Sequence, residues 1–185
     1  MSPGVYEAAY LCGGPHRVAL AAVAAMAHDG RISISRTRHR VKAVHRRAGH
    51  PVEQAVLDAL PEAGQVLGPL LQEVADSAAV AAVRDGLRDR GLAGHHSLAG
   101  HPHLSAAGRD ARRELEDAGP ALPGEQRVAV LGVPAITDPG LRGIFTAPDP
   151  PPGGKLVPKA PKTGAPGRYP SDPDLTMHPG ISGRW

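Results

Sequence analysis

A corner between two short helices constrains the fold of this chain more than any other feature. Residues 6–12 are apolar on one side of a helical pattern, and Gly13 suits the left-handed conformation in which helices end. Pro15 fits the first turn of the next helix, where its missing N–H costs nothing. Alanine dominates residues 16–29, so intrinsic helix propensity there is high. The sequence therefore predicts two helices joined by a tight turn.

A small hairpin is expected directly after the second helix. Gly30 ends that helix, and residues 31–35 alternate polar and apolar side chains as a half-buried strand does. A turn at residues 37–39 and a return segment around Val41 and Val44 would complete the hairpin. Together with the helix corner, this hairpin outlines a winged helix-turn-helix. A resemblance of fold alone does not establish a function.

The next part of the chain is also helical and partly repeats the opening. Helices are expected at residues 51–60, 66–74 and 78–90, and Ser77 is a good N-cap for the last of them. When Gly91 is aligned with Gly30, the apolar stripe of the expected helix at residues 78–90 coincides with that of the Ala-rich helix at residues 16–29. This similarity indicates an internal duplication, although two ordinary amphipathic helices can also produce it.

The second unit would end with its own wing and two more helices. Residues 93–104, rich in His and Gly, are the predicted second wing, and Ser105 caps a helix that follows. Residues 128–133 are apolar and fit a helix or a strand equally well. Thr137 or Asp138 caps a last short helix.

These elements predict a mainly α fold with small β-hairpins, built from two winged-helix-like units in tandem. The units are expected at residues 1–47 and 48–147, and a Pro/Gly-rich tail at residues 148–185. The tail holds ten Pro and six Gly among 38 residues with little apolar periodicity, which is typical of disorder. Only 3% of the chain is aromatic, so Ala, Val and Leu must build the core and we expect modest stability.

Several protein classes are disfavoured by the cysteine count and by hydropathy. Cys12 is the only cysteine, which excludes an internal disulfide and a cysteine-based metal cluster. No charged start followed by an apolar stretch indicates a secretory signal. The longest apolar run, residues 18–27, is far shorter than the roughly 20 residues of a membrane span. We therefore expect a soluble, cytoplasmic protein.

The net charge of +3 is distributed unevenly. Residues 31–47, the basic arm, contain no acidic residue, whereas residues 48–147 hold eight basic and thirteen acidic residues. Such an arm could contact phosphates in a salt-dependent manner, or it could be a solvated hairpin that pairs with the acidic body. The Ala-rich helix offers few polar side chains for reading bases. The cations of the arm are Arg31, Arg36, Arg38, Arg40, Lys42, Arg46 and Arg47.

Metal binding and catalysis receive less support. Four histidines near the second wing are close enough in sequence for metal ligands, but no cysteine or acidic residue accompanies them, so a polar loop is favoured. These are His95, His96, His101 and His103. Cys12 and His16 stand one helical turn apart without the third orienting group that a nucleophile needs. We therefore expect no catalytic residue, no cofactor and no metal.

Three phrases resemble an uncharacterised actinobacterial domain family. They are YEAAYLCGGP at residues 6–15, PVEQAVLDAL at 51–60, and VAVLG through DPGLR at 128–142. They are similar to the family's YE-AYLAGGP opening, its P-ERAVLDAL helix and its VALFG-AAL-ADPELRAAL segment, and the resemblance covers about residues 4–147. Many members carry transmembrane helices or Ser/Gly/Cys-rich tails, neither of which is evident here. Their genes often lie near multinuclear iron-dependent oxidases that modify ribosomally made peptides, and the family implies no established catalytic residues.

The leading hypothesis is a non-enzymatic interaction or adaptor module that binds a peptide or protein partner. Winged-helix grooves can hold a partner by strand addition or by helix-in-groove contact. Ile32 and Ile34 on the predicted strand are the candidate partner-binding positions. The alternative is a winged-helix regulator that binds DNA through the basic arm, and an enzyme ranks third.

Overall fold

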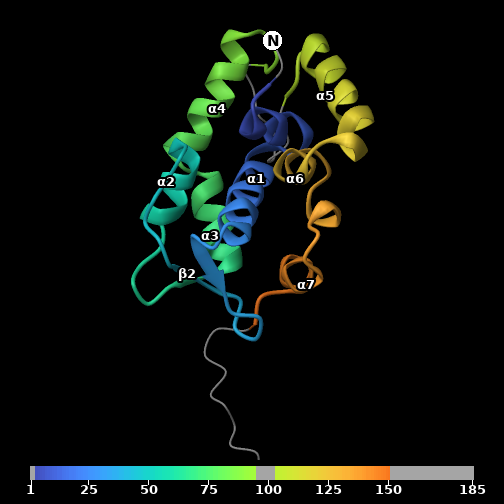
Figure 1. Ribbon diagram of the computed structural model, residues 1–185. Coiled ribbons are helices and arrows are strands. Elements are labelled where there is room, and N and C mark those ends of the chain that lie inside the picture. Colours follow the sequence, from blue (N-terminus) through green and yellow to red (C-terminus); the bar gives the residue numbers. More distant parts are fainter. Residues whose placement is uncertain (1–2, 95–102, 151–185) are drawn as a thin grey trace, which may run out of the picture. The chain divides into compact units, whose positions relative to one another are not determined.

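Helix α1 (Val5–His28) is the central element of the described residues, and all the later helices except the last pack against it (Figure 1). The computed structural model describes residues 3–94 and 103–150. Gly14 interrupts α1 with φ 70° and ψ −163°, a conformation that glycine adopts without a steric penalty. Pro15 begins the second part of the helix. The predicted corner is therefore confirmed, but the residue with positive φ is Gly14 and not Gly13, which we expected to end the first helix.

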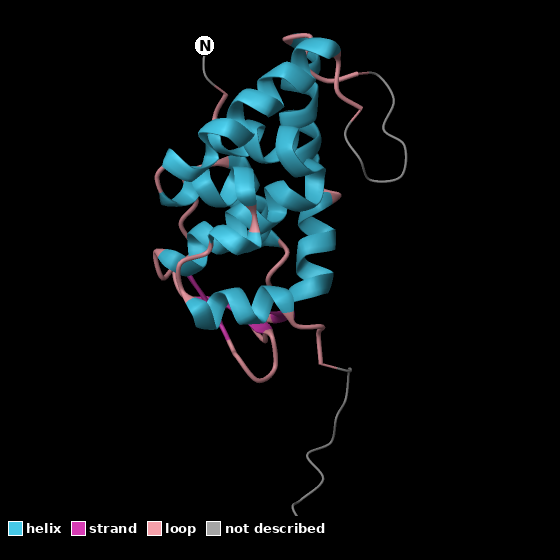
Figure 2. Cartoon of the chain, turned by 90° about the vertical axis from the view of Figure 1, so that its right-hand side faces the viewer, coloured by secondary structure: helices cyan, strands magenta, loops and turns pink. Residues whose placement is uncertain are grey.

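The remaining helices of the described residues divide into a group before and a group after residues 93–104, the predicted second wing. The first group is α2 (Pro51–Asp58), α3 (Leu67–Ala75) and α4 (Ala78–Asp89), and the second is α5 (Ala106–Ala118), α6 (Gly124–Leu131) and α7 (Pro139–Thr146). Two 3-10 turns, η1 (Gly119–Ala121) and η2 (Val133–Ala135), precede and follow α6. The described chain is mainly helical, as predicted, and its strands lie together at one end (Figure 2).

The strands form a three-stranded antiparallel sheet in the order β1-β2-β3. These are β1 (Ile32–Ile34), β2 (Arg40–Ala43) and β3 (Gln65–Val66). The predicted hairpin is thus confirmed, whereas β3 was not expected because it lies at the start of an apolar helical pattern. The turn between β1 and β2 ends in His39, a buried residue with φ 47° whose carbonyl accepts a hydrogen bond from Leu67 N (2.9 Å).

Helix caps follow the sequence closely. Ser77 Oγ accepts from Val80 N (3.4 Å), and Ser105 Oγ accepts from Gly108 N (3.0 Å), so both predicted N-caps are confirmed. Asp138, not Thr137, caps α7: its Oδ1 accepts from the N–H groups of the second and third helical residues. The ambiguous segment at 128–133 is the end of α6 followed by η2.

The larger of two hydrophobic clusters in the described residues crosses the boundary that we predicted at residue 47. Residues up to 151 group into one compact unit, in which α1 contacts helices from both predicted halves. Small and branched aliphatic side chains build the core, as the composition predicts. The largest fully buried ones are Leu11, Met26, Leu57, Leu60, Leu70 and Leu87.

Two regions named in the sequence analysis fall largely outside the described residues. A β-bridge between Ala93 and Leu104 lies at the base of the predicted second wing, whose residues 95–102 are not described. Of the predicted tail, residues 148–150 belong to the described unit and residues 151–185 lie outside it. None of the helices in the described ranges is long and apolar enough to cross a membrane.

Candidate functional site

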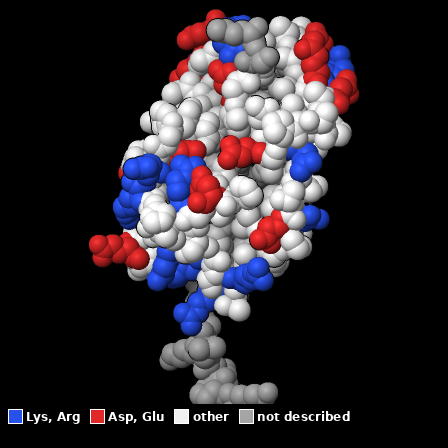
Figure 3. All heavy atoms as spheres, in the orientation of Figure 1, with Lys and Arg blue, Asp and Glu red and all other residues white. Residues whose placement is uncertain are grey.

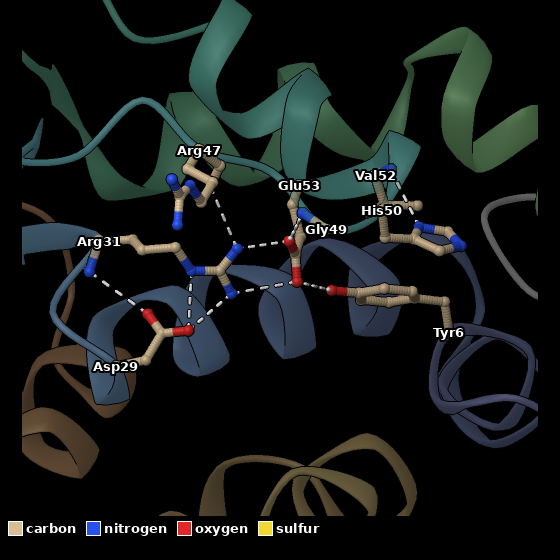
Figure 4. Close-up of polar contacts among 8 residues, drawn as sticks. All are labelled: Tyr6, Asp29, Arg31, Arg47, Gly49, His50, Val52 and Glu53. Carbon is tan, nitrogen blue, oxygen red and sulfur yellow. Dashed lines mark hydrogen bonds and ion pairs between the residues drawn. The ribbon is translucent and has the colours of Figure 1, made fainter.

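Arg31 and Glu53 are the centre of a polar network that joins α1, the start of β1 and α2 (Figure 4). Glu53 accepts hydrogen bonds from the Arg31 guanidinium, from Tyr6 Oη (2.9 Å) and from Gly49 N (2.7 Å). Its side chain is only 11% exposed. The guanidinium of Arg31 also pairs with Asp29 at 2.7 Å. One carboxylate therefore ties three elements together.

This network fixes the protonation of its members. Burial alone would raise the pKa of the Glu53 carboxyl, but the hydrogen bonds from Arg31, Gly49 N–H and Tyr6 outweigh it and hold that pKa at about 2. Burial and the adjacent Glu53 carboxylate raise the pKa of Tyr6 well above its usual range. Glu53 is thus ionised and Tyr6 neutral near pH 7. The arrangement is a structural clamp, and Arg31 is already paired within it.

Two further cations of the basic arm donate hydrogen bonds to backbone carbonyls. Arg46 donates from Nη1 to Leu57 O (3.1 Å) and from Nη2 to Leu60 O (2.8 Å), which satisfies carbonyls at the end of α2. Arg40 donates from Nη1 to the carbonyls of residues 63 and 64, at 3.0 and 2.7 Å. Three of the seven predicted cations therefore hold the fold together.

The other four cations are exposed, and the first of them lies near α7. They are Arg36, Arg38, Lys42 and Arg47. The Arg36 guanidinium lies against Gly140 at the start of α7, close enough to contribute to the lowered pKa of Asp138, whose main cause is the cap hydrogen bonds. Lys and Arg side chains gather at the end of the molecule that carries the hairpin (Figure 3). The basic surface is therefore real but smaller than the sequence alone suggests.

The two predicted partner-binding isoleucines present their backbone groups at the sheet edge and not their side chains. Ile32 is 2% exposed and belongs to the core, and Ile34 is half-buried. Arg31 O and Ser35 N bond to β2, so the alternating pattern directs the backbone groups of Ile32 and Ile34 to the free edge of the sheet. A partner strand could therefore pair with the backbone edge of β1, but the two isoleucine side chains offer it little surface.

A cavity of about 400 Å³ lies between the second part of α1 and the segment from α6 to α7. Ala21, Ala24 and Ala25 form its wall on α1, and Ile136 and Leu141 face them from the other segment. The polar residues that line it are His28, Glu125, Gln126, Thr137 and Asp138. The composition gave no signal for this cavity, because its two walls are more than 100 residues apart in the chain.

A second hollow of about 820 Å³ adjoins the cavity. Both are lined by Val5 and Gln126, which form their common border. Leu92, Leu115 and Val130 supply apolar surface on the far side of that border. The two hollows together form an extended, largely apolar depression along α6.

The candidates for metal binding and nucleophilic chemistry gain no support from the described residues. Burial raises the pKa of the Cys12 thiol to about 11, so it is protonated at neutral pH, and His16 is exposed. No group of three His, Cys, Asp or Glu in residues 3–94 and 103–150 could hold a metal. Of the histidine cluster, His95, His96 and His101 lie outside these ranges.

No known protein family, curated protein or solved structure matches this chain. The function must therefore be argued from the geometry of the hollows and of the hairpin.

Proposed function

We propose that this chain is a non-enzymatic interaction module that binds a peptide or protein partner in the cavity between α1, α6 and α7. The observation that carries the proposal is the cavity itself. Its volume of about 400 Å³ falls within the roughly 300–1,000 Å³ of ligand pockets, and its walls are mostly apolar with a few polar groups at the edge. Alanines on α1 leave the space that larger side chains would fill.

A partner side chain is the occupant that this shape favours. Protein interfaces concentrate their binding energy in a few large side chains that enter well-desolvated pockets. The adjoining hollow beyond Val5 and Gln126 extends the apolar surface, so a segment anchored in the cavity can continue along α6. Glu125 and Asp138 lie on the cavity lining, which favours a partner with basic residues beside its apolar anchor.

Filling the cavity tests this proposal. We expect Ala24→Leu to occupy the space and reduce recovery of a partner at least tenfold when the full chain is used as bait in lysate of the source organism and bound proteins are identified by mass spectrometry. Ala55→Leu, in a separate shallow hollow beside α2, is the matched control and should recover the same partner as the unchanged chain. Recovery of one protein set by all three chains would contradict the proposal. Thermal melts establish that each chain is folded.

The second candidate is a DNA-binding regulator that uses the basic arm, with the two halves as winged-helix-like units. The hairpin after α1 and the β-bridge after α4 support this arrangement, and the four exposed cations supply a surface for phosphates. The helix that would read bases is the second part of α1, however, and its side chains at Val18, Ala22 and Met26 are fully buried. Base-specific recognition by that helix is therefore disfavoured.

Membership of the actinobacterial domain family is likewise a proposal. Tyr6 lies in the first of the three resembling phrases and Glu53 in the second, and their hydrogen bond joins the two phrases in space. Asp138 and Leu141 of the third phrase line the cavity. The first two phrases therefore meet in the fold, and the third contributes to the cavity.

A further inference from the structure

The outer face of the β1–β2 hairpin places hydroxyl groups opposite cations. Ser33 pairs with Lys42 in the register, and the hydrogen bond from Ser35 N to Arg40 O (2.9 Å) continues that register by one further pair. Directly opposed residues of an antiparallel pair share a face, with Cβ atoms about 5 Å apart. The rise of a strand separates the two Ser–cation pairs by about 7 Å along the hairpin.

The turn adds two more donors to this face. Thr37 and Arg38 line the same open depression of about 560 Å³ as the two Ser–cation pairs. None of the described residues that line it is acidic. Serine and threonine hydroxyls, guanidinium groups and an ammonium group all donate hydrogen bonds, so the depression is a surface of donors with positive charge.

Arg40 is held in place for this role by the backbone beside it. Its Nη1 donates to the carbonyls of Ala63 and Gly64, which orients the guanidinium without neutralising it. The side chains of Arg38 and Lys42 are exposed. One hydrogen-bonded cation and two exposed ones therefore lie beside the hydroxyl groups.

We propose that this hairpin face binds phosphate groups, and that the two Ser–cation pairs, together with Arg38 at the turn, receive neighbouring phosphates of a nucleic-acid strand. Charge-assisted hydrogen bonds from guanidinium and ammonium groups to phosphate oxygens are strong, and hydroxyl side chains commonly complete such contacts. The spacing of the pairs along the hairpin is comparable to that of consecutive phosphates in a nucleic-acid strand. A small phosphate compound presents the same chemistry to a single pair. The site is separate from the cavity, and the proposal rests on the second candidate function, which it deepens by naming the residues that contact phosphate.

The test measures binding of a labelled single-stranded 12-nucleotide DNA to the full chain by fluorescence anisotropy over a range of salt concentrations. We expect the double variant Arg38→Gln/Lys42→Gln to lose at least tenfold in affinity at low salt. The slope of log K against log salt should fall by about 1.4, since each lost single-strand phosphate contact removes roughly 0.7. Ser33→Ala/Ser35→Ala, which leaves the charge unchanged, should weaken binding by about threefold to tenfold.

A charge-matched control separates a site from net charge. Arg112→Gln/Arg113→Gln removes two cations from the exposed face of α5, and the affinity should change less than twofold. Three results would each overturn the proposal. The two double variants that remove cations could weaken binding equally, the serine variant could have no effect, or the unchanged chain could fail to bind the DNA.

Competition identifies the source of the phosphate. Release of the DNA by micromolar pyrophosphate would support a small phosphate compound as the ligand, and release only by bulk salt would support the nucleic-acid backbone. Poly-glutamate that displaces the DNA as well as an oligonucleotide of equal charge would overturn the proposal, because the surface would then be a general polyanion patch. Circular dichroism establishes that every variant is folded.

Discussion

At the scale of single residues, the Glu53 carboxylate connects three separate segments of the chain. Its carboxylate is nearly buried, and it accepts hydrogen bonds from Arg31, Gly49 and Tyr6. Removing one partner of a buried charge pair leaves the other without compensation, which costs more than the pair contributes by itself. The position is therefore sensitive to substitution although it lies on a short helix near the surface.

We expect Glu53→Gln to lower the free energy of unfolding by about 2 kcal/mol at pH 7, measured by urea denaturation. The unfolded chain protonates this carboxyl near its ordinary pKa of 4.5, whereas the folded chain does so only near 2. The contribution is therefore complete above about pH 5 and is lost as the pH falls towards 2, so the variant and the unchanged chain should converge in acid. Glu116→Gln, in an exposed pair with Arg112, should change stability by less than about 0.5 kcal/mol. A difference that persists at pH 2 would contradict this account.

At the scale of elements, Gly64 sets the approach of β3 to β2. It has φ +77°, and a Cβ there would collide with Val41 O and with the side chain of Lys42. Gly30 has nearly the same φ, +76°, but open space around its Cα. Comparing the two positions separates the cost of the backbone conformation from the cost of the collision.

Gly64→Ala should destabilise the chain by at least about 1 kcal/mol more than Gly30→Ala, because both substitutions force a side chain into a left-handed conformation and only the first adds a steric clash. Urea denaturation of the two variants measures the difference. Equal destabilisation would contradict this prediction, because it would mean that β2 and β3 can move apart to accommodate the added methyl group at little cost.

The elements that could be predicted from the sequence are those specified by neighbouring residues. The hairpin follows from the alternation at residues 31–35, and the caps follow from Ser77 and Ser105 placed before apolar helical patterns. The pairing of Tyr6 with Glu53, 47 residues away, leaves no such pattern. The composition identified the basic arm, but which of its cations are free depends on carbonyls of α2 and of residues 63–64 that only the folded chain brings near.

At the scale of the whole molecule, the end of the described unit is held against the first turn of α3 and the turn between β1 and β2. Asp149 Oδ2 accepts from Gly68 N (2.8 Å) near the start of α3, and Oδ1 lies 3.4 Å from Nδ1 of His39. Asp149, the second residue of the predicted tail, therefore belongs to the packed unit.

Asp149→Ala should lower the free energy of unfolding by about 1 kcal/mol, because an N–H near the start of α3 loses its acceptor and His39 loses its neighbour. Asp117→Ala, at an exposed position on α5, is the control and should have an effect within about 0.5 kcal/mol. Urea denaturation measures both. Equal stability of the two variants would indicate that the Asp149 contacts contribute nothing.

The central position of α1 has a consequence for synthesis of the protein. Arg17 on α1 donates to Val130 O on α6, a partner 113 residues further along the chain. At the usual rates of translation, roughly 6 to 20 seconds pass between the appearance of these two residues on the ribosome. During that interval the Ala-rich helix, which holds the longest apolar run of the chain, has been made but cannot be fully covered. Until translation reaches α6, the apolar surface of α1 must be shielded by α2, α3 and α4 or by a chaperone.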